Sequence, residues 1–372
     1  MIYLTYNDQP SGIYNSQVID VVKCLNSIQN NDKVKLVALI SIRSFFKNRK
    51  LIKQRLPESK VLPMLPKPGL WRLNYFILIF LISSDRIIMA RGPFAAGLAL
   101  RLKRTGRVQK VIFDARGAYT AELNEYDVVK NETIKQQIPE IEKEAVLNSD
   151  FRLAVSNELV NYWKSTFNYN SNQHIIIPCT LSEDFVFDFP LAEELKQIRK
   201  EIGFSETDIV IAYSGSSAGW QSFSLIEKLL TQVLEKNKNV KLLWLTNHLN
   251  ENSDFVKQFR HRIKAAWVKP EEVKKYLLSG DFGLLFRENT VTNKVASPVK
   301  FAEYLSCGLN VIISENLGDF SEFVRKNNCG IVGEISVSNV DYSSKQSNHK
   351  LAMQHLIKEN YKTEYLKLIE LN

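Results

Sequence analysis

The hydrophobic residues of this chain fall in short runs, and longer segments with helical periodicity separate them. Short apolar runs bounded by turn residues are typical of buried strands. Strands that alternate with helical segments predict a parallel, doubly wound sheet. In the first half of the chain the predicted strands are 2–6, 34–41, 60–65, 86–90, 110–117 and 151–156.

The same pattern restarts after residue 185, where the strongly helical stretch "LAEELKQIRKEIG" leads to a second series of strands. We therefore predict an α/β protein with one Rossmann-like domain at 1–185, a second at 186–348, and helices at 349–372. Two such domains facing one another make a cleft at the carboxyl ends of their strands, where these sheets bind ligands. The second series of predicted strands is 208–215, 241–246, 265–268, 281–286, 310–314 and 330–335.

Charge narrows the choice of partner. The 49 Lys and Arg residues exceed the 40 Asp and Glu residues, giving a formal net charge of +9. This excess favours an anionic partner such as a nucleotide, an acidic lipid leaflet or nucleic acid. The basic residues are scattered, and neither an aromatic RNA-binding signature nor a Cys/His finger spacing occurs, so we expect no nucleic-acid partner.

The cysteines and the first residues bear on the compartment. Cys24, Cys179, Cys307 and Cys329 form no CxxC pair, which argues against a zinc site and against a disulfide framework. The opening "MIYLTYNDQP" lacks the basic and apolar regions of a secretory signal. We expect a cytoplasmic protein.

One apolar run, "LNYFILIFLISS" at 73–84, is shorter than the roughly 20 residues that span a bilayer. A helix in the core of an α/β domain is one interpretation, because the predicted strand 86–90 follows at once. A helix lying at a membrane surface is the other, because Trp71, Arg72 and Tyr75 resemble the aromatic and basic flank of such a helix.

The stretch "NKVASPVKFAEYLSCGLNVIIS", residues 293–314, has the signals of a short, well-bounded helix. Ser297 is a favoured N-cap, and Pro298 is a favoured first helical residue. We expect the helix to run to about Ser306, with Gly308 as its left-handed terminator.

The first turn of this helix predicts an anion site. The backbone N–H groups of Val299 and Lys300, the helix dipole and the Lys300 ammonium group together suit a diphosphate. Glu303 stands one turn further along and is a natural acceptor for a pair of ribose hydroxyls. One nucleotide is therefore able to bridge both ends of the helix.

A structural alternative remains open for the same stretch. In it the helix is simply capped and amphipathic, with Phe301, Tyr304 and Leu305 facing the core. Lys300 and Glu303 then form a solvated pair three residues apart.

The longer segment "DFGLLFRENTVTNKVASPVKFAEYLSCGLNVIIS", 281–314, resembles the donor site of retaining GT-B glycosyltransferases of family 4. The resemblance implies that Glu303 binds the ribose, that the helix start meets the diphosphate, and that Arg287 or Lys294 adds positive charge. Many relatives carry a glutamate where this chain has Val295. The family pattern Ser-Pro-x-Lys-x-x-Glu-Tyr-x-x-x-Gly falls on Ser297, Pro298, Lys300, Glu303, Tyr304 and Gly308.

Two glycine-containing turns resemble further parts of the donor site. In "IAYSGSSAGW" a strand ends in a turn whose Gly215 and Ser216 can cradle phosphate, although an ordinary strand-to-helix turn gives the same pattern. Relatives often place an arginine and a lysine in this turn, and this chain has no basic residue there, so the cations downstream must supply the charge. Gly12, after the first strand, is the glycine that approaches the sugar in the family.

"VIFDARGAYTAE" supplies the catalytic and acceptor-side candidates Asp114, Arg116 and Glu122. A buried strand that ends in charged residues usually ends at a ligand-binding edge, because an unpaired charge is costly inside a protein. Relatives often have a histidine here, and none of the five histidines of this chain lies at this position. The alternative is that Asp114 and Arg116 form a structural ion pair.

The resemblance implies a retaining, metal-independent hexosyltransferase of the GT-B fold without a cofactor, with a UDP or GDP sugar as its donor substrate. Its acceptor is a glycan or lipid-linked glycan bound by the first domain, and helices 349–372 pack back on that domain. Bacterial surface polysaccharide synthesis and a peripheral contact with the inner membrane are further expectations. A sugar-nucleotide epimerase of the same shape and a non-catalytic partner protein are the alternatives.

Overall fold

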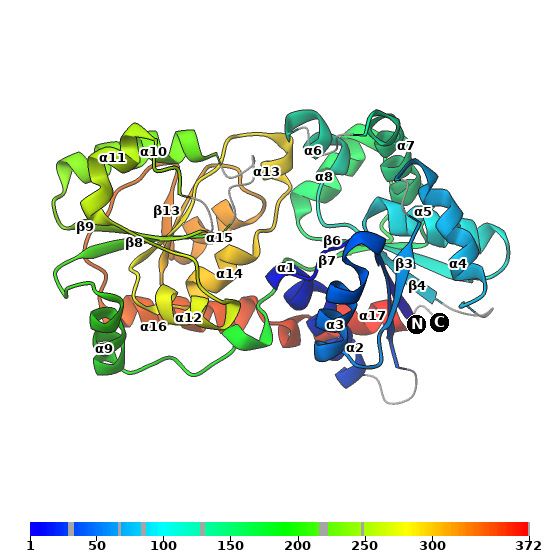
Figure 1. The fold of residues 1–372 in the computed structure, drawn as a ribbon, viewed down its shortest axis with the longest axis horizontal. Helices are drawn as coiled ribbons and strands as arrows, with labels where there is room; N and C mark the ends of the chain where they lie inside the picture. The colour runs from blue at the N-terminus through cyan, green and yellow to red at the C-terminus, as the bar shows by residue number, and fades with distance from the viewer. Residues whose placement is uncertain are drawn as a thin grey trace. The chain divides into compact units, whose positions relative to one another are not determined.

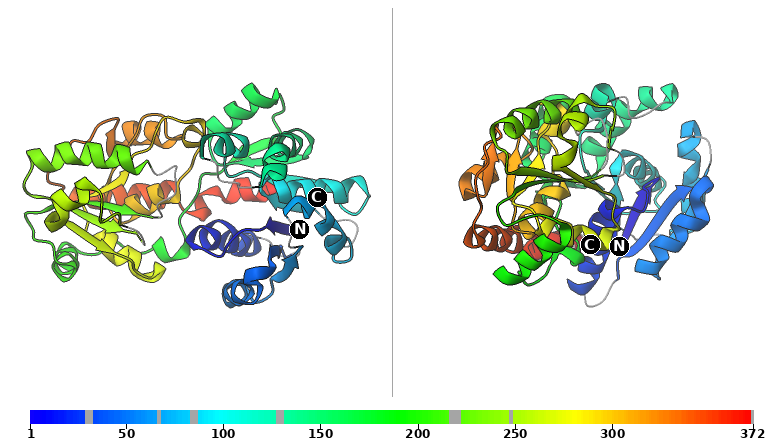
Figure 2. Two further views of the ribbon diagram at one scale, coloured as in Figure 1. Left: turned by 45° about the horizontal axis from the view of Figure 1, so that its top comes forward. Right: turned by 60° about the vertical axis from the view of Figure 1, so that its left-hand side comes forward.

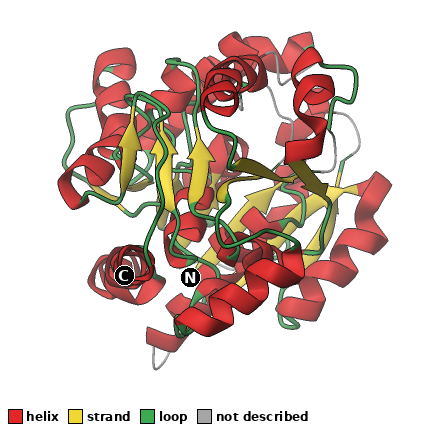
Figure 3. Cartoon of the chain, turned by 90° about the vertical axis from the view of Figure 1, so that its left-hand side faces the viewer, coloured by secondary structure: helices red, strands yellow, loops and turns green. Residues whose placement is uncertain are grey.

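The computed structural model describes residues 1–28, 33–65, 68–82, 87–126, 131–215, 222–246 and 249–370. The chain forms two compact units. Unit 1 contains residues 1–182 and 358–372, and unit 2 contains residues 183–357. Each unit has its own parallel sheet, and Figure 3 shows the strands in yellow with helices in red beside them.

Unit 1 is built on a seven-stranded sheet in the order β3-β2-β1-β4-β5-β6-β7. All neighbouring strands are parallel, and the strand order reverses direction at β1 and β4, as in a doubly wound sheet. The strands are β1 (Ile2–Tyr6), β2 (Lys35–Ser41), β3 (Lys60–Met64), β4 (Ile87–Arg91), β5 (Lys110–Asp114), β6 (Phe151–Ala154) and β7 (His174–Ile176).

The helices of unit 1 cover both faces of this sheet. On one face α2, α3 and α17 pack over a core that includes Tyr3, Leu36 and Tyr365, and the packing of α17 on α2 can be followed in Figure 1. The helices are α1 (Gly12–Tyr14), the π-turn η1 (Asn15–Ile19), α2 (Asp20–Ile28), η2 (Ile42–Ser44), α3 (Phe45–Arg55), η3 (Pro68–Asn74), α4 (Tyr75–Ile79), α5 (Gly92–Arg104), α6 (Tyr119–Tyr126), α7 (Glu132–Asn148), α8 (Asn157–Phe167), η7 (Lys358–Tyr361) and α17 (Lys362–Ile369).

Unit 2 is built on a six-stranded parallel sheet in the order β10-β9-β8-β11-β12-β13. The inner strands of this sheet are buried because helices cover both faces, as expected for a parallel sheet, whereas the two edge strands are partly exposed. The strands are β8 (Ile209–Ser214), β9 (Val240–Leu245), β10 (Ile263–Ala266), β11 (Phe282–Leu285), β12 (Asn310–Ile313) and β13 (Gly330–Val332).

Two helices, α10 and α11, lie on one face of this sheet, and α9, α12 and α16 lie on the other (Figures 1 and 2). The core under α10 and α11 is rich in aromatic residues, among them Tyr213, Trp244 and Phe255. The helices are η4 (Glu183–Phe185), α9 (Ala192–Ile202), α10 (Phe223–Lys236), α11 (Asp254–Phe259), η6 (Arg260–Arg262), α12 (Pro270–Leu278), α13 (Val291–Lys294), α14 (Val299–Ser306), α15 (Phe320–Asn327) and α16 (Tyr342–His355).

Several bounds differ from the sequence prediction. The sequence prediction puts a boundary at 348/349, but α16 runs through that point and packs on α14, so the chain returns to unit 1 only at Lys358. The strand β7 is missed by the hydrophobic pattern because it is a three-residue edge strand. The strand predicted at 265–268 lies at 263–266, and Trp267 is exposed.

The apolar run at 73–84 forms neither a long core helix nor a membrane span. Its ordered helix α4 has five residues, with Tyr75 and Leu78 buried, while Phe76 is 52% exposed and Phe80 is 88% exposed. Ser83 and Ser84 lie outside the described residues. In the part of the chain that the structure describes, no helix is both long and apolar enough to cross a membrane.

Candidate functional site

The carboxyl edge of the sheet in unit 2 brings Lys300, Tyr213 and Gly215 together. Lys300 Nζ lies 4.4 Å from the centre of the Tyr213 ring and donates a hydrogen bond of 3.4 Å to the Tyr213 hydroxyl. Gly215 follows β8 with φ of +146°, and a Cβ on it would stand 2.3 Å from Lys300 Nζ. The lysine therefore occupies space that only a glycine leaves open.

Helix α14 begins one residue later than the sequence predicts. Pro298 is its N-cap, with extended ψ of 126° and no side-chain cap, and Val299 is the first helical residue. Ser297 is therefore not the N-cap; it lies buried just before the helix. The predicted end is confirmed, because the helix stops at Ser306 and Gly308 has a positive φ.

Tyr304 fixes α14 against the strand ends. Its hydroxyl accepts a hydrogen bond of 2.9 Å from the backbone N–H of Ser214 and donates one of 3.4 Å to the carbonyl of Leu284. Gly283 in β11 lies directly under the ring, because a Cβ there would come within 2.3 Å of ring carbons. This packing sets the distance between α14 and β8, and so places Lys300 beside the β8 turn.

Burial shifts the acid–base behaviour of both ionisable residues on α14. Desolvation, and then the nearby Arg287, lower the pKa of Lys300 well below its usual range, while Glu303 acts to raise it. Desolvation raises the pKa of Glu303 to about 7, against the opposing effect of Lys300. Shifts of this kind gather at functional sites, because such sites hold partly dehydrated charges for a ligand.

Arg287 lies in the loop between β11 and α13 and is buried. Its Nη1 donates to Asn293 Oδ1 at 3.3 Å, and its backbone N–H donates to Ser314 Oγ at 3.3 Å. Asn293 in turn donates to the carbonyl of Glu288 at 3.0 Å. The guanidinium is thus held in a fixed place close enough to Lys300 to lower its pKa.

The remaining predicted donor-site residues are placed as follows. Lys294 ends α13 and is exposed. Val299 is buried at the start of α14. Val295 is buried, and Glu288 is exposed. Ser216 lies outside the described residues.

In unit 1, Asp114 ends β5 and is 0% exposed. Its Oδ1 lies 2.8 Å from Arg116 Nε, and its Oδ2 lies 3.6 Å from Arg91 Nη1 and accepts a hydrogen bond from Tyr3. Arg91 ends the neighbouring strand β4 in register with Asp114. The structure therefore places Asp114 where it holds two arginines, not where its own oxygens reach the surface.

The two arginines extend this cluster to neighbouring loops. Arg91 Nε lies 3.4 Å from Asp8 Oδ2, just after β1, and Arg116 Nη1 donates to Gln17 Oε1 at 3.4 Å. Gln17 lies in the π-turn η1, a kind of turn that is frequent at functional sites. Asp8, Gln17 and Arg91 are not among the predicted site residues, although Arg91 is the last residue of β4 and Asp8 stands two residues after β1.

Gly12 and Glu122 lie at helix starts of unit 1. Gly12 opens α1 behind the N-cap Ser11, and no described atom lies within 4 Å of where its Cβ would be, so the fold itself does not demand glycine there. Glu122 lies in the first turn of α6, and burial raises its pKa. Glu142 caps that helix by accepting from the N–H groups of Tyr119 and Thr120 at 3.0 and 2.7 Å.

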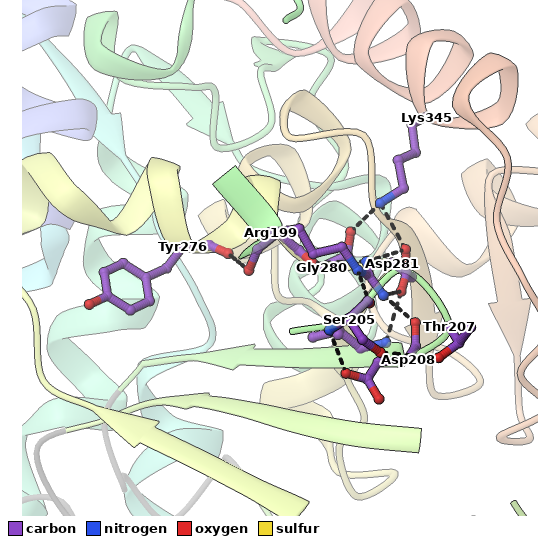
Figure 4. A network of polar contacts seen from close by, with 10 residues as sticks. Arg199, Ser205, Thr207, Asp208, Tyr276, Gly280, Asp281 and Lys345 are labelled. Atoms are coloured by element: carbon purple, nitrogen blue, oxygen red, sulfur yellow. Dashed lines mark hydrogen bonds and ion pairs between the residues drawn. The ribbon is translucent and has the colours of Figure 1, made fainter. Parts of the chain in front are cut away.

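The opposite, amino-terminal edge of the sheet in unit 2 carries a second charged cluster (Figure 4). Asp281 accepts two hydrogen bonds of 3.0 Å from Arg199 on α9, and Lys345 Nζ on α16 lies 2.8 Å from the same carboxylate. Arg199 also donates to the carbonyls of Ser205 and Ser279. This cluster borders a cavity of about 210 Å³, and its hydrogen bonds are directed inward to hold α9 and α16 on the sheet.

Within the described ranges, no group of three His, Cys, Asp or Glu side chains lies close enough to hold an ion.

Comparison with solved structures defines the fold class. The chain is similar to HepE of Anabaena in complex with UDP, with 11% identity, a TM-score of 0.72 and 100% of both chains covered. It is also similar to sucrose-phosphate synthase of Thermosynechococcus elongatus, with 12% identity, a TM-score of 0.71, and 100% of this chain and 99% of that chain covered. The chain therefore has two Rossmann-like domains of the GT-B fold.

Two further comparisons concern a structure with a lower TM-score and a match to part of the sequence. A glycosyltransferase of Rickettsia africae is similar with 11% identity, a TM-score of 0.66, and 100% of this chain and 99% of that chain covered. Residues 228–359 match the family model described as Glucosyltransferase 3-like, C-terminal domain. No curated protein matches the sequence significantly. The second domain is thus glycosyltransferase-like in sequence as well as in fold.

Proposed function

We propose that the protein is a retaining glycosyltransferase that moves a sugar from a UDP or GDP sugar to a glycan or lipid-linked glycan acceptor. The observation that carries the proposal is the position of Lys300 over Tyr213 and beside Gly215, with Glu303 on the same helix. Lys300 and the turn at Gly215 are suited to bind a diphosphate, and the carboxylate of Glu303 is suited to bind the hydroxyls of a ribose. The matched range 228–359 contains Lys300 and Glu303, and HepE was solved with UDP.

In the proposed reaction the diphosphate leaves the sugar with negative charge. Lys300 and Arg287 counter that charge from fixed positions, which is the electrostatic task of a preorganised anion site. In this proposal Lys300 and Arg287 supply the positive charge near the turn at Gly215, because the turn itself contains no basic residue. We assign the role to side-chain cations, so the proposed transfer needs no divalent ion and is expected to continue in the presence of EDTA.

We assign the acceptor side of the reaction to the carboxyl edge of the sheet in unit 1. Arg91 and Arg116 are held there by Asp114, and Glu122 lies in the first turn of α6. In this assignment Asp114 is a positioning residue, because its carboxylate is fully buried. The two guanidinium groups are suited to anionic or hydroxyl-rich parts of a substrate.

A non-catalytic partner protein is the second candidate. It is favoured by Val295, which is buried where relatives of the resembled family carry a glutamate. Against it stand the lowered pKa of Lys300 and the raised pKa of Glu303, because shifts of this kind cluster at functional sites. Bacterial surface polysaccharide synthesis remains the proposed setting of the transferase.

The test is to incubate the protein with each of several UDP and GDP sugars, with and without a glycan extract or lipid-linked acceptor, and to follow products by mass spectrometry. Release of the nucleoside diphosphate that depends on an acceptor, and that is lost in Lys300→Met, supports the transferase. A new sugar nucleotide formed without any acceptor would identify an epimerase. No conversion together with no nucleotide binding would favour the non-catalytic partner.

A further inference from the structure

Helix α3 carries an unusual surface for a helix of a parallel α/β sheet. Between residues 42 and 57 the chain has no Asp or Glu. Three apolar side chains in and next to the helix are also exposed, and the largest, Phe46, is 84% exposed. The cations of the segment are Arg43, Lys47, Arg49, Lys50, Lys53 and Arg55.

The spacing of buried residues shows which face of α3 points outward. Asn48, Ile52 and Leu56 recur every four residues and are buried against the sheet. The outward face therefore presents Phe46 with Lys47 and Lys50 beside it. We call this surface, made of Ile42, Arg43, Phe46, Lys47, Arg49, Lys50 and Leu51, the α3 face; all seven residues are exposed.

The cations of the α3 face are not used by the fold. No ion pair among the described residues involves Arg43, Lys47, Arg49 or Lys50, whereas Lys103 and Arg104 elsewhere in unit 1 pair with Asp150 and Glu144. The ring of Phe46 makes a T-shaped contact with that of its chain neighbour Phe45, with ring centres 5.5 Å apart, and is otherwise largely exposed. Packing within the protein therefore accounts neither for the exposed ring of Phe46 nor for the positive charge of the α3 face.

The geometry points to the α3 face as a docking surface for an anionic lipid leaflet. An apolar ring flanked by Lys and Arg is the composition of helices that lie in the membrane interface, where the ring enters the headgroup boundary and the cations meet acidic lipids. Charge complementarity favours this occupant, because the surface has one sign only. Acidic proteins would be held by charge as well, but they would not require the exposed ring.

The α3 face is joined to the acceptor edge of unit 1. Asn48 Nδ2 donates to Gln9 Oε1 at 2.8 Å, and the neighbouring Asp8 pairs with Arg91. The helix also follows β2 through the single turn η2, at the carboxyl edge of the sheet. Docking through this face would bring that edge to the lipid surface; this consequence rests on the proposed function, since it gives the transferase direct access to a lipid-linked acceptor.

The experiment is cosedimentation with vesicles of phosphatidylcholine alone or of equal parts phosphatidylcholine and phosphatidylglycerol, without nucleotide or acceptor. We expect binding to the anionic vesicles only, reduced about tenfold or more by K47E/K50E. Phe46→Ser, which leaves the charge unchanged, is expected to weaken it by roughly tenfold. The matched control K236E/K238E changes exposed lysines of unit 2 by the same charge and should bind as the wild type does.

Several results would overturn the proposal. These are equal binding to both vesicle types, equal loss in the two charge-reversal variants, or wild-type binding by Phe46→Ser. A loss confined to Phe76→Ser/Phe80→Ser would place docking at α4 instead. Circular dichroism and thermal unfolding of each variant ensure that lost binding is not lost folding. Nucleotide binding without vesicle binding overturns only the docking, and vesicle binding without nucleotide binding overturns only the transferase.

Discussion

Lys300 Nζ lies over the ring of Tyr213, 4.4 Å from its centre. The two residues come from α14 and β8, which are far apart in sequence, and the contact holds a cation at the end of the strand, next to Gly215. A cation placed over an aromatic face is attracted by the ring but keeps its hydrogen-bond donors for other partners. The contact between Lys300 and Tyr213 thus positions the lysine of the α14 motif for the diphosphate binding that we propose.

Lys300→Met is expected to reduce the affinity for a nucleoside diphosphate by about tenfold or more, because it removes a charge-assisted contact. Its thermal stability should be equal to or higher than that of the wild type, since burial lowers the pKa of Lys300 and the methionine carries no charge to desolvate. Calorimetric titration and thermal unfolding measure the two effects, with Lys236→Met as the control. Weaker binding that merely follows lost stability would contradict the assignment.

Gly215→Ala should displace the Lys300 amine. The added Cβ would stand 2.3 Å from Nζ, and the lysine can move more easily than the strand. The φ of +146° adds backbone strain of about 1–3 kcal/mol. We expect a folded protein with nucleotide affinity at least about tenfold lower. Gly69→Ala, whose Cβ would meet only one atom at 4.0 Å, should bind nucleotide normally; equal affinity in both variants would be evidence against the site.

Glu303→Gln should change how stability depends on pH. The folded protein holds the Glu303 proton up to a pKa of about 7, above the ordinary value of 4.5, so folding takes up protons between these values. The free energy of unfolding of the wild type therefore falls as pH rises through this window. The variant lacks this fall and should be more stable by about 1–3 kcal/mol above pH 7, with little difference below 4.5. Urea unfolding across pH measures it, and a constant difference would contradict the raised pKa.

Tyr304→Phe should destabilise unit 2 by about 1–3 kcal/mol, because the backbone N–H of Ser214 and the carbonyl of Leu284 lose their hydroxyl partner. It should also loosen α14 against β8 and lower nucleotide affinity. Denaturant unfolding of the variant gives the first quantity and calorimetric titration gives the second. A loss of only a few tenths of a kcal/mol would mean that the ring packing over Gly283 holds the helix without the hydroxyl.

The sequence was sufficient for the architecture because alternating apolar runs and helical segments leave few arrangements other than doubly wound parallel sheets. The predicted boundaries of helices and strands were wrong where the local sequence pattern was weak. The edge strand β7 is too short to show a period, and α16 continues through the predicted boundary because its packing on α14 is a tertiary contact. The run at 73–84 was ambiguous, since exposure of Phe76 and Phe80 depends on neighbours that the sequence does not name.

The geometry of the candidate site could be predicted from the sequence only in part. Helix α14, Lys300 and Glu303 follow from capping signals and spacing, and only the N-cap was shifted from Ser297 to Pro298. The contact of Lys300 with Tyr213 joins residues 87 positions apart, and no local pattern encodes it. In unit 1 the burial of Asp114 beneath Arg91 and Arg116 depends on strand register, which fixes neighbours only after folding.

The central claim, that α14 and the end of β8 bind a nucleoside diphosphate, is tested most directly by thermal unfolding with UDP, GDP, ADP and CMP. Wild type and Glu303→Ala are compared. We predict that UDP or GDP raises the wild-type unfolding temperature and that the rise is lost in the variant, because ligand binding to the folded state adds to its stability. No shift with any nucleotide from folded wild-type protein, or an equal shift in the variant, would contradict the account.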